Sequence, residues 1–157
     1  MSAQVWIAIL VGLAATVDDL RRRQIANWIP AVALAGGFAW QISQAGWRGG
    51  LNALGGTAAG FAVFLVFYLL GGMGGGDVKL MAGFGALLGA RSLFEAALWT
   101  AGVGGVMALA VLAIRPVWKR LRARFFRSGA EAAETSDSIP YAPAITLGVW
   151  LSLVPKG

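Results

Sequence analysis

Apolar residues of this chain gather in long runs, separated by short glycine-rich or charged stretches. Six runs can be distinguished: Ala3–Val17, Trp28–Ser43, Gly55–Leu70, Val78–Ala90, Leu93–Ile114 and Ile139–Val154. A helix needs about 20 residues to cross the roughly 30 Å hydrocarbon core of a bilayer, and about 17 is the usual lower limit. The fourth and sixth runs are short by this measure, but Lys79 and Arg91 can extend the fourth by reaching toward the headgroups. The pattern predicts an all-α, polytopic membrane bundle of about six transmembrane helices, with residues 1–157 forming a single domain.

Two pairs of glycines in these runs have the G-x-x-x-G spacing that lets membrane helices approach closely. They are Gly56 with Gly60, and Gly85 with Gly89. Small residues of this kind favour helix packing where no hydrophobic effect drives helices together. We expect packing within the bundle, and dimerisation is the alternative.

Composition agrees with a membrane protein and removes several kinds of chemistry. Of the 157 residues, 58% are hydrophobic, which is too apolar for a small soluble domain. Cysteine and histidine are both absent. This excludes disulfides, cysteine nucleophiles, Ser-His-Asp triads and zinc or haem held by His or Cys. We therefore expect no metal and no cofactor, and any catalysis would use carboxylates, Lys, Tyr, or Ser activated by Lys.

Positive charge is concentrated between the apolar runs. The net charge is +6, but this clustering favours a membrane surface over nucleic acid. If the N-terminus lies outside, the loops 21–26, 73–77 and 115–138 are cytoplasmic, and together with Lys79 beside the second loop they hold ten of the 13 Lys and Arg residues. The bias predicts both termini on the non-cytoplasmic side. The polar stretch 128–138 is expected to be a flexible part of the last cytoplasmic loop, and the basic stretch 115–127 to bind anionic headgroups.

Three aspartates fall at the predicted cytoplasmic ends of apolar runs: Asp18, Asp19 and Asp77. An acid at membrane depth costs about 2.5–3.5 kcal/mol at a helix centre and less near the interface, so it is a functional candidate. Two carboxyl groups on facing helices cannot both ionise cheaply, and the pair then supplies a general base and a general acid. The base takes a proton from water, which attacks a peptide carbonyl, while the acid protonates the carbonyl oxygen. The alternative is that all three are ordinary interface charges beside Arg21–Arg23 and Lys79.

The glycine-rich stretch "GGMGGGDVKL", residues 71–80, does not fit a phosphate-binding loop. A P-loop requires G-x-x-x-x-G-K-[ST], but Gly76 is followed by Asp77 and Val78. A G-x-G-x-x-G fingerprint fails as well, because Asp77 stands where the last glycine belongs.

Three segments resemble the type IV prepilin peptidases, which are G-x-G-D intramembrane aspartyl peptidases. "GGGD" at Gly74–Asp77 matches the G-x-G-D motif, and "DVKL" continues it. "DLRRRQIANW" at Asp19–Trp28 resembles the other active-site segment, with Ala26 in place of the usual Pro. "IPYAPAITLG" at Ile139–Gly148 is similar to the last span. The three segments occur in the order found in that family, and with the apolar runs the resemblance covers nearly the whole chain.

The resemblance implies that Asp19 and Asp77 are the two catalytic acids. Asp19 is the first of them because it keeps the spacing of that family to Asn27. Asp18 is then a neighbour, and its side chain points about 100° away on a helix, so the two cannot face one groove.

Four further residues are expected to support this site or the approach of substrate. Gly74 and Gly76 would permit backbone angles that are closed to other residues and would let a substrate chain come close. Lys79 and Asn27 flank the two acids in the matching segments.

The resemblance also implies a function, a substrate and a location. The protein would be an aspartic-type endopeptidase that removes the basic leader from type IV or Flp prepilins or pseudopilins. It would act at the cytoplasmic face of the bacterial inner membrane, with prepilin and membrane lipid as partners and no nucleic acid; the oligomeric state is left open. Longer members of that family carry an insert with paired C-x-x-C motifs and also methylate the new N-terminus. This cysteine-free chain resembles the short, TadV/CpaA-like form of Flp pili and Tad secretion, for which no methyltransferase activity is expected.

Two alternatives remain open. The chain could be a non-catalytic assembly or scaffold protein of a pilus or secretion system, or a small proton-coupled transporter. A transporter is expected to place its acids near the bilayer midplane. Asp19 and Asp77 are instead predicted to lie at one face, which counts against transport.

Overall fold

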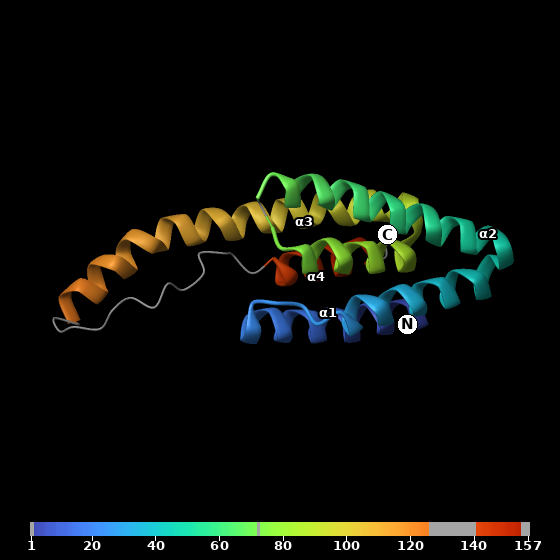
Figure 1. The fold of residues 1–157 in the computed structure, drawn as a ribbon, viewed down its shortest axis with the longest axis horizontal. Helices are drawn as coiled ribbons and strands as arrows, with labels where there is room; N and C mark the ends of the chain where they lie inside the picture. Colours follow the sequence, from blue (N-terminus) through green and yellow to red (C-terminus); the bar gives the residue numbers. More distant parts are fainter. Residues whose placement is uncertain (1, 72, 126–140, 155–157) are drawn as a thin grey trace.

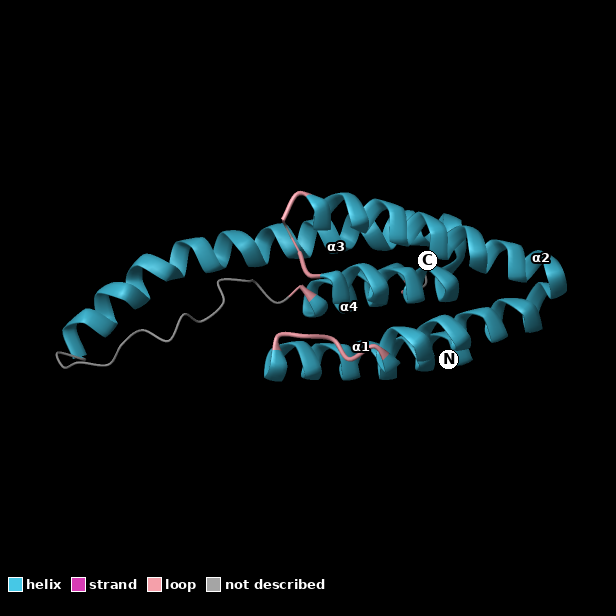
Figure 2. Cartoon of the chain, in the orientation of Figure 1, coloured by secondary structure: helices cyan, strands magenta, loops and turns pink. Residues whose placement is uncertain are grey.

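The computed structural model describes residues 2–71, 73–125 and 141–154, and this part of the chain is helical. The helices are α1 (Ala3–Arg22), α2 (Trp28–Leu69), α3 (Gly75–Phe125) and α4 (Ala142–Ser152), and no strand occurs among the described residues (Figures 1 and 2). The all-α prediction is therefore confirmed for this part. The stretch 128–138, the first two residues of the run Ile139–Val154 and the basic side chains of 115–127 lie outside what is described.

Helices α2 and α3 each contain one break at which the chain turns back on itself (Figure 1). In α2 the break lies at Ala45 and Gly46, where the φ of Gly46 is 56°, and in α3 it lies at Gly89, with a φ of 74°. Such positive φ values favour glycine, which has no Cβ. The first break falls between the second and third of the predicted apolar runs, and the second falls near the end of the fourth run, Val78–Ala90. The connection expected at residues 44–54 is thus mostly helical, and a two-residue break replaces a loop.

Three of the described helical stretches are long and apolar enough to cross a membrane: Ala3–Arg22, Trp28–Leu69 and Gly75–Val111. Helix α4 is also apolar but has only 11 residues. These features support a membrane protein. Six separate spans and the side on which the termini lie remain predictions.

The part of α3 before its break lies at the centre of the bundle. Every residue from Leu80 to Gly89 is buried, and Phe84 and Leu87 are among the largest fully buried side chains. Figure 1 shows this segment between α1, α4 and the second half of α2. Because protein rather than lipid surrounds it, the short fourth run need not match the bilayer by itself.

Glycines set the distance between α2 and α3. A Cβ added at Gly56 would collide with the backbone of Gly85, and one added at Gly85 would collide with the backbone of Gly56. A Cβ at Gly60 would lie 2.7 Å from the carbonyl oxygen of Met81. Both predicted G-x-x-x-G pairs therefore serve packing inside the bundle, because residues of both pairs lie in this contact.

Side-chain amides satisfy the backbone groups that the break at Gly89 leaves unpaired. The carbonyl oxygen of Leu87 accepts hydrogen bonds from Gln4 Nε2 (2.9 Å) and Gln41 Nε2 (3.3 Å). The backbone N–H of Ala90, the residue after Gly89, donates to Asn52 Oδ1 at 3.3 Å. In a membrane such groups need partners within the protein, so these amides allow α3 to turn at this point.

Candidate active site

Asp19 lies near the end of α1 and faces the interior of the bundle. Only 7% of the residue is exposed. Its Oδ2 accepts a hydrogen bond of 3.1 Å from the backbone N–H of Ala142, the first residue of α4, 123 positions away in the sequence. The first N–H groups of a helix have no partner within it and carry partial positive charge, so they are good donors to a carboxylate.

Hydrogen bonds between α4 and α1 keep this helix start beside Asp19. Thr146 Oγ1 donates to the carbonyl of Gly12 at 3.2 Å, and Trp150 Nε1 donates to the carbonyl of Ala8 at 3.1 Å. A Cβ at Gly12 would collide with the Thr146 side chain, so the two helices are in close contact.

Asp18 points away from Asp19 and binds the turn between α1 and α2. Its Oδ2 accepts a hydrogen bond of 2.8 Å from the backbone N–H of Ala26, and its Oδ1 lies 3.4 Å from Arg22 Nε. The predicted divergence of the two neighbouring side chains is thus observed. Asp19 lies inside the bundle, and Asp18 stabilises the turn at residues 23–27.

Asp77 lies in the first turn of α3 and is likewise 7% exposed. Its Oδ2 accepts a hydrogen bond of 3.1 Å from the N–H of Gly74, and its own N–H donates to the carbonyl of Gly74 at 3.1 Å. A side chain that reaches back to the N–H before the helix resembles one half of a capping box. Its other oxygen, Oδ1, is buried and has no hydrogen-bond partner among the described residues.

The two buried acids lie at the same end of the bundle and interact electrostatically. In Figure 1 the end of α1, the start of α3 and the start of α4 gather at this end. The N–H of Gly74 fixes one oxygen of Asp77, and the N–H of Ala142 fixes one oxygen of Asp19. When two carboxyl groups repel each other in this way, a state in which the pair binds one proton is favoured.

The predicted role of Gly74 and Gly76 in providing unusual backbone angles is wrong. The positive-φ glycine described in this stretch is Gly71, not Gly74 or Gly76. What Gly76 provides is a close approach, because an added Cβ would lie 3.1 Å from the Cβ of Ile25 in the α1–α2 turn. At Gly74 an added Cβ would make only ordinary contact, 3.5 Å from Asp77 Oδ2.

Lys79 and Asn27 are brought together by the fold. Lys79 Nζ donates to Asn27 Oδ1 at 2.9 Å, and both residues are exposed. This bond joins the first turns of α3 to the residue just before α2. It links the segment that carries Asp77 to the turn that follows Asp19, so the pair is a structural link between the two acidic segments.

Sequence reasoning missed the backbone groups that hold the acids. The N–H of Ala142 carries no side-chain signature, and only the chain fold brings it to Asp19. The sequence does contain one signal of a helix start there, Pro143, because proline is common in the first turn of a helix.

Comparisons with known proteins identify the family but no individual relative. A search of curated proteins and a search of solved structures each found no match. The model of the type IV leader peptidase family matches residues 6–109, and this region includes α1, α2, and α3 as far as residue 109. Because the match covers well over half of the chain and contains both Asp19 and Asp77, the chain belongs to the type IV leader peptidase family.

Proposed function

We propose that this protein is an aspartic-type endopeptidase in which Asp19 and Asp77 activate water to cut a peptide bond of a prepilin-like substrate. The observation that carries the proposal is the pair of buried carboxyl groups, which come from separate helices and interact at one end of the bundle. Membership of a leader peptidase family supports the same chemistry.

The hydrogen bonds of the two acids suit them to this reaction. Gly74 orients Asp77 through Oδ2, which leaves the buried Oδ1 for a water molecule or a substrate group. Ala142 orients Asp19 in the same way. Fixed groups of this kind need little reorganisation when charge develops during a reaction.

The proposed steps need no group beyond the two acids and water. The ionised carboxylate takes a proton from water, and the water oxygen bonds to the carbon of the scissile carbonyl. The protonated carboxyl gives its proton to the carbonyl oxygen, which produces a tetrahedral diol. In the second step the carboxyl that took the water proton gives it to the leaving nitrogen as the C–N bond breaks, and the other, now ionised, carboxylate takes a proton from a diol hydroxyl. The dyad thereby returns to its starting protonation state.

The substrate would be the precursor of a type IV or Flp pilin, or a pseudopilin, with a basic leader followed by an apolar helix. The family match supports a leader-bearing substrate, and the predicted topology puts the acids at the cytoplasmic face of a bacterial inner membrane. The chain has no cysteine for the paired C-x-x-C motifs of longer relatives, so we expect peptidase activity without methyl transfer.

The test is a processing assay with the full chain in proteoliposomes and a panel of type IV and Flp pilin precursors. Mass spectrometry of each precursor should show loss of the basic leader from its N-terminus. A protein that inserts and is folded but cuts none of the panel would contradict peptidase function and favour a scaffold role.

A further inference from the structure

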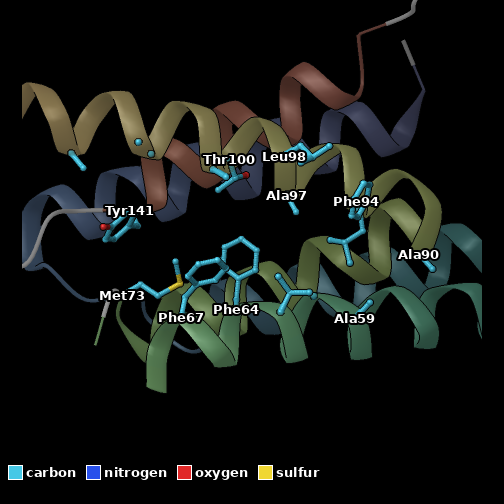
Figure 3. Close-up of a pocket in the computed structure, with 17 residues that line it drawn as sticks. Ala59, Phe64, Phe67, Met73, Ala90, Phe94, Ala97, Leu98, Thr100 and Tyr141 are labelled. Carbon is cyan, nitrogen blue, oxygen red and sulfur yellow. The ribbon is translucent and has the colours of Figure 1, made fainter. Parts of the chain in front are cut away.

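An apolar groove runs between the second half of α2 and the part of α3 that follows the break (Figure 3). Its volume is about 500 Å³. Its walls come from the ranges 59–67 and 90–108, and the polar side chains among its lining residues are those of Thr100 and Tyr141. The rest of the lining is aliphatic, aromatic, methionine or glycine, as expected for a surface that receives an apolar partner.

One end of the groove lies next to the groups that hold the acids. Met73 and Tyr141 line this end, and Ala90 lines the other (Figure 3). Met73 precedes Gly74, whose N–H binds Asp77, and Tyr141 precedes the residue whose N–H binds Asp19. The groove is therefore continuous with the proposed catalytic end of the bundle.

The length of the groove suits a membrane helix. The lining residues of α3 extend from Ala90 to Ala108, which corresponds to about 27 Å along a helix. The hydrocarbon core of a bilayer is about 30 Å thick. Small residues on this face, among them Ala97, Ala101 and Gly105, allow another helix to approach closely.

A second hollow at the same end of the bundle fits the substrate less well. It is lined by Asp18, Arg21 and Arg22, among others. Neither hollow is lined by Asp19 or Asp77 themselves, so the two are distinguished by the character of their walls. The two arginines of the second hollow would repel a basic leader, so electrostatics also favour the apolar groove.

We infer that the groove between α2 and α3 receives the apolar helix that follows the scissile bond, and that its shape selects which precursors are cut. The inference rests on the proposed function, because a helix seated in the groove would present its end to Asp19 and Asp77. The occupant is a single apolar helix of the substrate. Lipid as the only occupant is an outcome of the tests below.

Two glycines of α3 offer a matched pair of variants. A Cβ added at Gly105 or at Gly102 meets no atom within 4 Å, and both residues are exposed. Gly105 lines the groove, whereas Gly102 does not. Gly105→Leu should therefore fill the groove without disturbing the bundle, and Gly102→Leu controls for the change in helix propensity.

We expect Gly105→Leu to lower kcat/KM for precursor cleavage by about tenfold or more, mainly through a higher KM, because overfilling a packing site is costly. Gly102→Leu should cleave at the wild-type rate. Initial rates are measured in proteoliposomes at several precursor concentrations. Equal kinetics for the two leucine variants, with wild-type cleavage intact, would overturn the inference and leave the proposed function standing. Absence of wild-type cleavage would contradict the proposed function itself, and the inference with it.

Cross-linking gives a second measurement that does not depend on rates. The chain contains no cysteine, so Ala101→Cys in the groove and Gly102→Cys beside it each introduce a single thiol. Each is combined with Asp77→Asn to keep the precursor uncut, and mixed with a pilin precursor that carries one cysteine in its apolar helix. After oxidation of the mixture with copper–phenanthroline, a disulfide adduct is expected from Ala101→Cys and not from Gly102→Cys. A groove that holds only lipid would give no precursor adduct from Ala101→Cys, and this result would overturn the inference.

Discussion

At the scale of single residues, neighbouring aspartates have separate tasks. Asp18 accepts a hydrogen bond from the α1–α2 turn, whereas Asp19 accepts one from the start of α4. Successive side chains on a helix diverge by about 100°, so one of two adjacent acids can face the bundle while the other binds a turn. This division explains why only one of the two is buried in the bundle, as Asp77 is.

Variants of Asp18 should separate a structural role from a catalytic one. Asp18→Asn keeps an oxygen that accepts from the N–H of Ala26, so cleavage should stay near the wild-type rate. Asp18→Ala leaves that N–H without its partner, and we expect a loss of about 1–3 kcal/mol in the free energy of unfolding. The ion pair with Arg22 adds little, because the Arg22 side chain is 77% exposed. Thermal unfolding in detergent and the processing assay measure the two effects. Loss of cleavage in Asp18→Asn would show that Asp18, not Asp19, belongs to the dyad.

The family resemblance selected Asp19 over Asp18 as the first catalytic acid, but it did not indicate what holds this side chain in place. The spacing to Asn27 selected Asp19, and the structure places this side chain inside the bundle. The donors to the two acids are the backbone N–H groups of Gly74 and Ala142, and such groups cannot be predicted from the types of the residues that carry them. The prediction of unusual backbone angles at Gly74 and Gly76 was wrong. A glycine in a motif can be required because a neighbouring segment packs closely against it, as Ile25 does at Gly76, and not only because its φ is positive.

At the scale of elements, the break at Gly89 lets a single long helix supply both a central segment and one wall of the groove. Gly89 has a φ of 74°, which other residues rarely adopt, and a Cβ at this position would collide with the Asn52 side chain. Apolar patterning predicted an interruption between the runs Val78–Ala90 and Leu93–Ile114, and the observed break lies just before it, at Gly89. The pattern of apolar residues did not predict that α3 continues as a helix on both sides of a single non-helical residue. Hydropathy indicates which residues avoid water, but it does not indicate which backbone groups are hydrogen-bonded.

Gly89→Ala should destabilise the protein. The added Cβ would collide with the Asn52 side chain, and a residue other than glycine at this φ and ψ costs about 1–3 kcal/mol. We expect a loss of at least about 1 kcal/mol in the free energy of unfolding, visible as a lower Tm in detergent. Gly102→Ala is the control, since its site is open and helical, and it should be neutral or slightly stabilising. Equal Tm values for the two variants would contradict the structural role of the break.

At the scale of the whole molecule, the apolar runs together with composition were sufficient to predict an all-α membrane protein, and three long apolar helical stretches agree with it. The arrangement around the central segment of α3 could not be predicted, because it depends on contacts between residues far apart in sequence, such as Gly56 with Gly85. The short fourth run looked marginal as a membrane span, and its burial in protein explains why it can be short.

The predicted orientation in the membrane can be tested with single cysteines, since the natural chain has none. Ser2→Cys lies near the N-terminus and should react with a membrane-impermeant maleimide added to spheroplasts. Gln24→Cys lies in the exposed α1–α2 turn and should react only after lysis. The reverse labelling pattern would contradict a cytoplasmic position for the acids.

The most direct test of the proposed chemistry is the cleavage rate of Asp19→Asn and Asp77→Asn in proteoliposomes, followed by mass spectrometry of a precursor that the wild-type protein cuts. Each single variant should lose about 10²-fold or more of the rate, because general acid–base catalysis contributes at least that much. The double variant should be hardly worse than either single one, because the two acids act as a unit. Wild-type cleavage by a folded, inserted Asp19→Asn or Asp77→Asn protein would contradict the two-aspartate mechanism.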